Sequence, residues 1–327
     1  MDELNGCTVT VTIPLFDSSR FIDDCLNGLL KQTYAPSEII FVIDNRTTDN
    51  SEEILKRRMN EFGSLRIVKQ NDRKGLAGAR NIGIKEAKSD VIWFLDVDDM
   101  PHPTFLEELL SVMMETDADT VICNHFQSFK REMGIAPEKN YSFVVRDGKY
   151  AVEHYTDYPI YSWSRIQKKS VFNENSIFRE HPAAEDIEQT IRQYSVSNKV
   201  CYYNKPLFTY VKRKSSSSKK NRSGEIQSLE DIVSSLLPYV KEIMPESYEG
   251  FRTRILQNMI RQSTFSDYHT YSEAYKQSIS HSIMKDIDYK TTEMKIYSRS
   301  KLLYYLLLFP FSHCLWERRK GVWDQRI

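Results

Sequence analysis

Apolar residues recur along the first part of this chain in two patterns, one typical of buried strands and the other of amphipathic helices. Short apolar runs, rich in β-branched residues, predict strands at 8–13, 38–44, 65–68 and 91–95. Between these runs, apolar positions spaced three and four residues apart predict helices. Strands and helices that alternate in this way form a mostly parallel sheet with right-handed crossovers. The pattern therefore predicts an α/β fold whose strand ends meet along one edge.

Acidic residues follow two of these strands at the point where each strand ends. The apolar run Val91–Leu95 breaks off into Asp96, Asp98 and Asp99, and an earlier strand ends in Asp44. Carboxylates are expensive to bury without partners, so we expect them just past the strands, facing something cationic. Hard oxygen ligands suit Mg²⁺ or Mn²⁺, which bridge a protein carboxylate to substrate phosphates. A metal site and a solvated acidic turn are both open on these residues alone.

The second half of the chain is less regular. Its predicted strands are short and more widely spaced: 119–124, 142–145, 199–203 and 207–211. From Glu225 onward the apolar spacing is helical. We predict one α/β domain over residues 1–222, with a regular half at 1–125 and a less regular half at 126–222. A separate helical region is predicted over 223–327.

Composition narrows the class of partner. The 327 residues include 45 basic and 45 acidic side chains, so the formal net charge is zero. This balance argues against a nucleic-acid-binding protein that uses a global basic field. The five cysteines form no Cys-x-x-Cys pair, which fits a reducing compartment, and the first residues show no secretory signal. We therefore expect a cytoplasmic protein that acts on small molecules.

Four segments resemble the family 2 glycosyltransferases of GT-A fold, in the family's order and spacing: Thr10–Phe16, Ile43–Ser51, Gly75–Gly83 and Phe94–Asp99. The similarity covers approximately residues 8–215. It implies a Rossmann-like, mostly parallel sheet flanked by helices. It also implies a metal-dependent, inverting enzyme that moves a sugar from a nucleotide-diphosphate sugar, with UDP expected, to a growing cell-surface glycan or a lipid-linked acceptor.

The resemblance implies roles for individual residues. The loop after the first strand and Asp44 hold the base and ribose, and Asp96 with Asp98 holds Mn²⁺ or Mg²⁺ on the diphosphate. The donor-binding residues implied in this way are Pro14, Phe16, Asp44, Gly78, Arg80, Asp96, Val97, Trp163 and Arg213. One segment departs from the pattern, because the chain has Asp44-Asn45-Arg46-Thr47 where the family usually has Asp-Asp-Gly-Ser. This departure changes the segment that is expected to recognise the base, because the second Asp and the glycine of the family pattern are replaced.

Three of these assignments keep an alternative. Arg80 either contacts the diphosphate or braces Asp96 or Asp44 through a salt bridge. Trp163 forms either the floor under the donor sugar or part of the hydrophobic core. Asp49 is interpreted as a helix cap rather than a ligand.

Glu185 and Asp186 precede an amphipathic helix and resemble the family's Glu-Asp signature. Inverting transfer requires a carboxylate that takes the proton of the acceptor hydroxyl. We assign Asp186 as this base, with Glu185 orienting or supporting it. Without the resemblance, an acidic pair at a helix start is usually a cap or a dipole partner. His181 is interpreted as a surface residue, with the metal or the acceptor as the alternative.

Two further segments keep competing interpretations. The basic stretch 212–222, which contains Arg213, is either a lid that closes on the diphosphate or a solvated linker. The apolar stretch 302–311 lies in a terminus with eight basic and three acidic residues from Lys290 onward. Residues 299–327 therefore predict either peripheral contact with the inner face of an anionic membrane or a packed helix, which includes a homodimer contact.

A second class of function competes with the enzyme. The chain could be a nucleotide-sugar-binding protein without catalysis, or a nucleotidyltransferase-like protein. The paired acids at Asp96 and Asp98 and at Glu185 and Asp186 favour the enzyme. The chain also lacks an early glycine-rich, basic nucleotidyl loop near the first strand.

Overall fold

The structure is a computed structural model. It describes these residues: 6–72, 74–180, 185–212, 222–256 and 258. The chain divides into two compact units, Met1–Asn221 and Arg222–Ile327, and each is described by itself.

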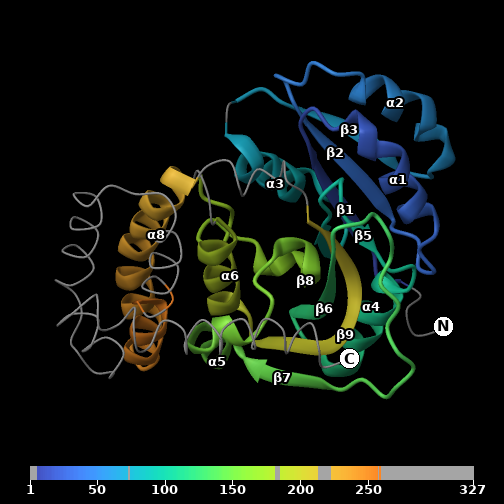
Figure 1. The fold of residues 1–327 in the computed structure, drawn as a ribbon. Helices are drawn as coiled ribbons and strands as arrows, with labels where there is room; N and C mark the ends of the chain where they lie inside the picture. Colours follow the sequence, from blue (N-terminus) through green and yellow to red (C-terminus); the bar gives the residue numbers. More distant parts are fainter. Residues whose placement is uncertain (1–5, 73, 181–184, 213–221, 257, 259–327) are drawn as a thin grey trace. The chain divides into compact units, whose positions relative to one another are not determined.

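The first unit contains the strands and all helices up to α6 (Figure 1). Its strands are β1 (Val9–Leu15), β2 (Glu38–Asp44), β3 (Leu65–Gln70), β4 (Val91–Phe94), β5 (Met100–Pro101), β6 (Thr120–Ser128), β7 (Phe143–Asp147), β8 (Arg165–Lys168) and β9 (Lys199–Val211). Its α-helices are α1 (Ser19–Leu30), α2 (Ser51–Arg58), α3 (Gly75–Glu86), α4 (Phe105–Thr116), α5 (Gly148–Glu153) and α6 (Glu185–Val196). Short 3₁₀ helices lie at Met59–Glu61, Tyr155–Asp157, Ser162–Ser164 and Lys169–Val171.

The strands form one sheet in the order β3-β2-β1-β4-β8-β6-β9-β5, with β7 paired to β9. The first four strands in this order are all parallel, as are β6 and β9. Strand β8 runs antiparallel between β4 and β6. This arrangement confirms the predicted α/β class with a mainly parallel sheet, and it brings the ends of β1, β2 and β4 to one edge.

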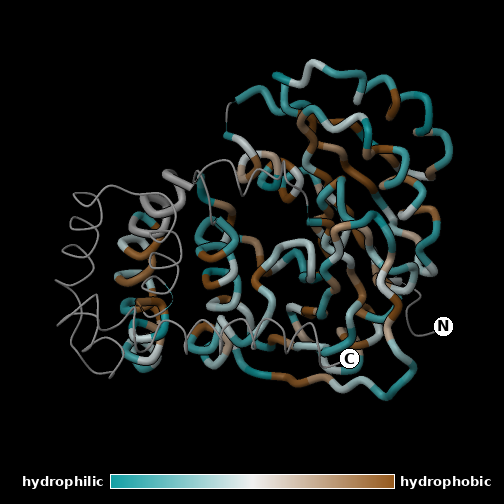
Figure 2. Tube along the Cα trace, viewed as in Figure 1, coloured by the Kyte–Doolittle hydropathy of each residue, from teal (hydrophilic) through white to brown (hydrophobic). Residues whose placement is uncertain are grey.

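Helices cover both faces of the parallel strands, which explains the long apolar runs of the two strands β2 and β4 (Figure 1 and Figure 2). Alternate residues of each strand face opposite sides. In β4, Val91 and Trp93 pack in the large core with α1 and α4, whereas Ile92 and Phe94 pack with α3 residues such as Ala77. The continuous apolar run is therefore two interleaved core faces.

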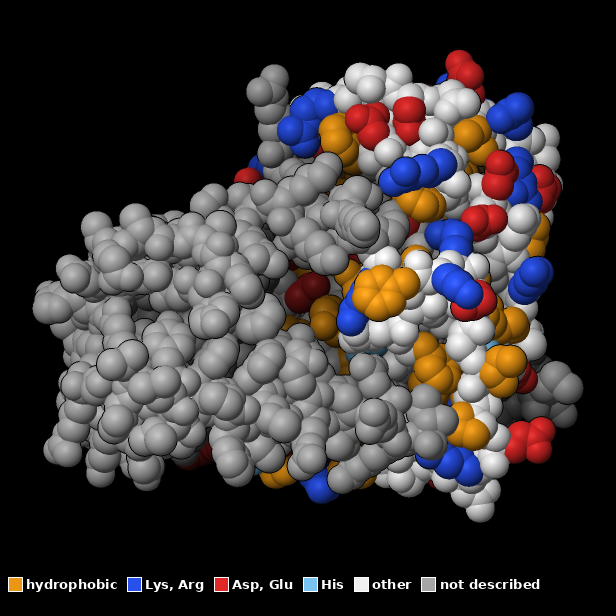
Figure 3. Space-filling model, in the orientation of Figure 1, with side chains coloured by type: hydrophobic (Ala, Val, Ile, Leu, Met, Phe, Trp, Pro, Cys, Tyr) orange, Lys and Arg blue, Asp and Glu red, His pale blue; other side chains and the backbone are white. Residues whose placement is uncertain are grey.

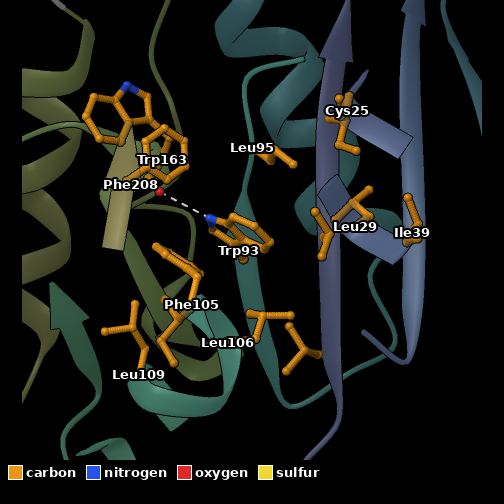
Figure 4. Close-up of a cluster of buried hydrophobic side chains, with 14 of the residues drawn as sticks. Cys25, Leu29, Ile39, Trp93, Leu95, Phe105, Leu106, Leu109, Trp163 and Phe208 are labelled. Carbon is orange, nitrogen blue, oxygen red and sulfur yellow. Dashed lines mark hydrogen bonds between the residues drawn. The ribbon is translucent and has the colours of Figure 1, made fainter. Parts of the chain in front are cut away.

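The large core centres on Trp93 (Figure 4). Its ring stacks on Phe105 at 4.4 Å, and its indole Nε1 donates to the carbonyl oxygen of Trp163 over 3.1 Å. Phe105 in turn meets Phe208 of β9 edge to face. The parallel half and the second half of the sheet therefore share one core, and the loop after β4 rests on a rigid base.

Two predicted boundaries were wrong. The glycine-containing stretch 72–81 has the composition of a loop and is predicted as one, but from Gly75 onward it forms the first half of α3, which begins with a φ of +58°. The predicted strands 199–203 and 207–211 are one strand, β9. Pro206, within β9, pairs with Asn124 at an irregularity in the ladder, where a missing N–H is tolerated.

The second unit is helical where it is described, in agreement with the periodicity of the sequence. Helix α8 (Arg222–Ile243) contains Pro238 and is followed by helical residues at 248–256. Ile232, Leu236 and Phe251 are buried. Across the described parts of both units, no helix is long and apolar enough to cross a membrane.

On the face of the molecule in Figure 3, acidic and basic side chains are interspersed over the described surface. They do not gather into one field of a single sign on that face. This distribution agrees with the zero formal net charge and with a small-molecule partner.

Candidate active site

The acidic loop after β4 lies where the sequence predicted it. The N–H of Leu95 still donates to the carbonyl oxygen of Thr12 in β1, over 3.0 Å, and the chain then leaves the sheet. Asp96 and Asp98 are partly exposed at this point, whereas Asp99 turns inward and is 3% exposed. The loop therefore has two partly exposed carboxylates, Asp96 and Asp98, and one buried carboxylate, Asp99.

Asp99 accepts a hydrogen bond from the backbone N–H of Val211 over 3.2 Å, which ties the acidic loop to β9. Burial raises the pKa of this carboxyl well above its usual range, and the nearby charge of Asp96 raises it further. The hydrogen bond from Val211 and the charge of Arg131 offset only part of this rise. Asp99 therefore holds a proton more readily than an exposed aspartate, and it serves the interior of the loop rather than its surface.

Arg80 of α3 lies among three carboxylates. Its guanidinium nitrogens are 3.4 Å from Asp96, 3.6 Å from Glu185 and 3.2 Å from Asp186. The side chain is 1% exposed, and its Cζ lies 5.1 Å from the ring centroid of Phe178. Of the two carboxylates that Arg80 was predicted to brace, the structure places Asp96 beside it, whereas Asp44 pairs with Arg46. The burial favours the bracing role over direct contact with a diphosphate.

Glycines allow α3 to bring Arg80 to this position. A Cβ on Gly83 would lie 2.7 Å from the Cβ of Thr12, so only glycine lets the helix approach β1 this closely. A Cβ on Gly78 would lie 2.6 Å from Nε2 of Gln70, at the end of β3. Both glycines therefore serve the close packing of the helix on the sheet, and the helix in turn carries Arg80 to the edge.

Glu185 and Asp186 form the first turn of α6. Asp186 accepts a hydrogen bond from the hydroxyl of Ser162 over 2.6 Å and a second one from Arg80 over 3.2 Å. Burial raises the pKa of Glu185, and so does the charge of Asp186, while Arg80 opposes both effects. The two acids thus differ in environment, and Asp186 is held in place by a neutral donor and a cationic one.

The base edge, defined here as Phe16, Asp44 and Arg46 at the ends of β1 and β2, contains a contact that the sequence did not predict. Both carboxylate oxygens of Asp44 are engaged by the guanidinium of Arg46, with Nε donating to Oδ1 over 2.8 Å and Nη2 to Oδ2 over 2.6 Å. In the structure, Arg46 occupies that carboxylate, and Arg46 also lies over the ring of Phe16 at 5.5 Å.

At this edge, the loop after β1 and the loop after β2 are joined by hydrogen bonds in which an aspartate of each loop accepts backbone N–H groups of the other. Asp17 accepts the N–H of Thr48 over 2.8 Å, and Asp49 accepts those of Ser19 over 2.8 Å and Ser51 over 3.1 Å. Asp49 therefore caps the start of α1 across the loop, which confirms its interpretation as a cap. These contacts fix the two loops against each other.

Trp163 is 3% exposed and belongs to the large core. Its ring stacks on Tyr161 at 4.8 Å and on Phe208 at 4.4 Å. This burial favours the core alternative over a floor for the donor sugar. The neighbouring Arg165 is also buried, and it donates to Thr190 over 2.8 Å and to Gln193 over 2.9 Å, both on α6. Arg165 therefore anchors the helix that carries the acid pair.

The remaining predicted site residues fall into two groups. Pro14 and Val97 lie at the ends of β1 and β4, with Pro14 partly exposed and Val97 6% exposed. Arg213, His181 and the segment 299–327 lie outside the described residues.

The residues of the acidic loop fit a hard divalent cation. Within the described part of the chain, no three His, Cys, Asp or Glu side chains converge as a ready-made metal site. Asp96 and Asp98 offer two partly exposed carboxylates, which suits an ion that takes its other ligands from phosphate and water. The three carboxylates within 3.6 Å of Arg80 place further negative charge beside this loop, which also fits a cation.

Sequence reasoning missed two residues of this site. Ser162 donates to Asp186, and Arg46 holds Asp44. Ser162 lies in a 3₁₀ helix whose sequence carried no signal beyond its closeness to Trp163. Arg46 did have a signal, since it stands where the family usually has glycine.

Comparison with known proteins agrees with this geometry. The family profile described as "Glycosyl transferase family 2" matches residues 10–179. The Streptococcus pneumoniae protein "Glycosyltransferase GlyG" is 30% identical over 225 residues, which cover 64% of this chain and 72% of GlyG. Other curated relatives are matched over 31% to 63% of their own length.

Solved structures share the fold at low sequence identity. Residues 1–349 of S. aureus TarS, in complex with UDP-GlcNAc, have a TM-score of 0.66 at 17% identity, with 94% of this chain and 91% of that chain covered. The mannosyltransferase PcManGT from Pyrobaculum calidifontis, in complex with GDP-Man and Mn²⁺, has a TM-score of 0.53 at 13% identity, with 94% and 87% covered. Together with the family match, these similarities establish that the chain belongs to glycosyl transferase family 2 and is a glycosyltransferase of GT-A fold.

Proposed function

We propose that the chain transfers a sugar from a nucleotide-diphosphate sugar, with UDP as the nucleotide, to a hydroxyl group of a saccharide or lipid-linked saccharide, with inversion at the anomeric carbon. The observation that carries the proposal is the convergence of Asp96, Glu185 and Asp186 on Arg80, all within 3.6 Å. It joins the loop expected to hold the diphosphate to the acids expected to activate the acceptor. The UDP-GlcNAc complex of TarS supports the choice of UDP.

Asp96 and Asp98 would hold Mn²⁺ or Mg²⁺, and the Mn²⁺ complex of PcManGT supports this assignment. The bound ion would neutralise charge on the departing diphosphate. Val97 lies between the two ligands, and its burial fixes the direction in which both carboxylates point. Arg80 keeps Asp96 in place from the protein side.

Asp186 is the proposed general base. As the acceptor oxygen attacks the anomeric carbon, the hydroxyl proton passes to the carboxylate of Asp186, and the bond between the anomeric carbon and the diphosphate oxygen breaks. The products are the new glycoside, a nucleoside diphosphate and protonated Asp186. Ser162 and Arg80 both donate to Oδ1 of Asp186, so they fix the orientation of the carboxylate.

Glu185 has a supporting role in this scheme. Burial and the neighbouring Asp186 raise its pKa, so it holds a proton more readily than an exposed glutamate. Its Oε1 also lies 3.6 Å from Nη1 of Arg80. Glu185 thereby shares the guanidinium of Arg80 with Asp186 and Asp96.

The decisive experiment incubates the protein with a panel of nucleotide sugars and saccharide acceptors, with Mn²⁺ and with a chelator, and measures released nucleoside diphosphate. We expect release from a UDP-sugar that requires both the ion and an acceptor. Analysis of the anomeric configuration of the product tests inversion. Binding of nucleotide sugars without release, across the panel, would favour the non-catalytic alternative.

A further inference from the structure

The sequence departure at Arg46 has a structural counterpart at the base edge. Oδ1 of Asp44 accepts hydrogen bonds from the backbone N–H of Arg46 over 2.9 Å and from its Nε over 2.8 Å, while Oδ2 accepts from Nη2 over 2.6 Å. A residue two positions along the chain thus holds the carboxylate through a bidentate fork. This geometry is the strongest form of an arginine–carboxylate contact.

Exposure separates the two partners. The side chain of Asp44 is 6% exposed, whereas that of Arg46 is 46% exposed. The outermost charged group of the pair is therefore the guanidinium. A guanidinium carries five N–H donors, and Arg46 directs only two of them to Asp44, so three remain available to a ligand or to water.

Phe16 completes this surface. Its ring is 51% exposed, and Cζ of Arg46 lies 5.5 Å from the ring centroid. A planar cation beside an exposed aromatic ring offers a base both a stacking surface and hydrogen-bond donors. Asp44, beneath the guanidinium, offers neither of these to a ligand.

Hydrogen bonds within the protein hold the loop around Arg46 in place. Asn45 donates its backbone N–H to Gln70 over 3.0 Å and its side-chain amide to the carbonyl oxygen of Asn71 over 3.1 Å. Asp17 holds the N–H of Thr48 from the other loop over 2.8 Å. A preorganised donor loses less conformational entropy when a ligand binds, so this loop suits recognition.

We propose that Arg46, rather than Asp44, reads the nucleobase of the donor, by donating N–H groups to a carbonyl oxygen of the base. Asp44 is a positioning residue that holds the guanidinium in the reading orientation. The oxygen that is read is the one at C4 of uracil or at C6 of guanine. Cytosine is excluded because it carries an amino group at C4 and its carbonyl oxygen lies at C2. This inference rests on the proposed function, since it requires a nucleotide donor.

Cytosine and uracil provide the sharpest comparison because they are nearly isosteric. Uracil presents an oxygen where cytosine presents an amino group, and a guanidinium has no acceptor with which to meet an amino group. The alternative arrangement has Arg46 swing aside so that Asp44 accepts the N3–H of uracil. In that arrangement Arg46 competes with the base, so its removal would strengthen binding.

The experiment measures the dissociation constants of UDP, CDP and GDP by calorimetry in Mn²⁺, for the unaltered 327-residue chain and for R46A and R46K. We expect the unaltered protein to favour UDP over CDP by about tenfold to a hundredfold, the usual effect of a hydrogen bond to a charged group. R46A should bind UDP about tenfold more weakly and lose most of the preference. R46K keeps the charge but not the fork, so it should retain UDP affinity better than R46A while losing the preference.

Two controls complete the design. Arg57 is exposed on α2, so R57A makes the same charge change outside the base edge and should leave all three constants unchanged. D44N alone should reduce the preference for UDP over CDP. In the R46A variant, adding D44N should change this preference little, because Asp44 acts through Arg46. A large effect of D44N in the R46A background would assign the reading role to Asp44 and overturn the proposal.

The outcomes separate this inference from the proposed function. Tighter UDP binding by R46A, or an unchanged ratio of the UDP and CDP constants, overturns the role of Arg46 alone. A preference for GDP over UDP that depends on Arg46 supports the role and corrects the expected nucleotide. If the unaltered protein binds none of the three diphosphates, the proposed function fails and this inference fails with it.

Discussion

Arg80 and Arg46 stand at the same edge of the sheet and both pair with carboxylates, but their surroundings differ. Arg80 is 1% exposed and meets three acids, whereas Arg46 is 46% exposed and meets Asp44. Breaking a buried pair leaves charges stranded in a medium of low polarity, while an exposed pair contributes little to stability. The comparison indicates that exposure separates an arginine that braces a site from one that can read a ligand.

The largest expected effect comes from exchanging each arginine for methionine. R80M should lower the free energy of unfolding by about 3–5 kcal/mol, because Asp96, Glu185 and Asp186 lose their shared cation. R46M should lower it by less than about 1 kcal/mol. Urea unfolding of both variants measures the difference. Similar losses of unfolding free energy for the two variants would show that exposure does not distinguish the roles of Arg80 and Arg46. If R80M does not fold, R80K, which keeps the charge, should recover the folded state.

The second effect concerns turnover on the Arg80 side of the edge. D186N is nearly isosteric and can still accept hydrogen bonds from Ser162 and Arg80, but it cannot take a proton at neutral pH. We expect turnover to fall by about 10²- to 10⁴-fold while donor affinity and the preference for UDP over CDP persist. E185Q is the matched control and should lose less. Full turnover by D186N, with loss in E185Q, would reassign the base.

The third prediction tests whether the protein binds the diphosphate and recognises the base of the donor independently. D98A removes one proposed ligand of the ion, so Mn²⁺-dependent donor binding should weaken by at least about tenfold. Because the base edge is untouched, the ratio of UDP to CDP affinity should stay constant. Calorimetry with and without Mn²⁺ tests both statements. Unchanged affinity in Mn²⁺ would contradict the metal assignment, and a changed ratio would show that the two parts of the donor site are not independent.

Much of this arrangement could be predicted from the sequence, for a physical reason. Strand Glu38–Asp44 matched its predicted bounds because an apolar run between two polar segments has only one way to be buried. The parallel order of strands then dictates that residues such as Asp44 and Asp96 share an edge. Periodicity therefore determined the scaffold and the location of the site.

Periodicity does not determine which side chains pair within that site. Arg46 follows the strand in a loop, where no repeating pattern fixes the direction of a side chain, so its pairing with Asp44 needed the structure. Ser162 reaches Asp186 from 24 positions away along the chain, through a 3₁₀ helix that has no apolar face. The burial of Trp163 also depends on partners such as Phe208 on β9, far along the sequence.

The smallest expected effect is on stability and comes from Asp99, the buried acid of the acidic loop after β4. Burial, and then the charge of Asp96, raise the pKa of Asp99 in the folded protein, while the unfolded chain keeps an ordinary value of about 3.9. From about pH 4 upward, the folded protein therefore retains a proton that the unfolded chain has lost, so this carboxyl makes the folded state less stable as the pH rises through that window.

D99N removes this penalty and can still accept the hydrogen bond from Val211. In the absence of divalent ions, we expect D99N to raise the Tm at pH 7.5 by roughly 2–4 °C, and we expect the gain to shrink toward pH 4.5, where Asp99 is protonated in the folded protein. Calorimetric scans across this range test the trend, with D72N as a control because Asp72 is exposed. A gain that is independent of pH, or a loss at pH 7.5, would mean that Asp99 is stabilised as a carboxylate by contacts stronger than those of Val211 and Arg131. In that case the protein itself would hold Asp99 as a carboxylate without a cation, and only Asp96 and Asp98 would support a metal site.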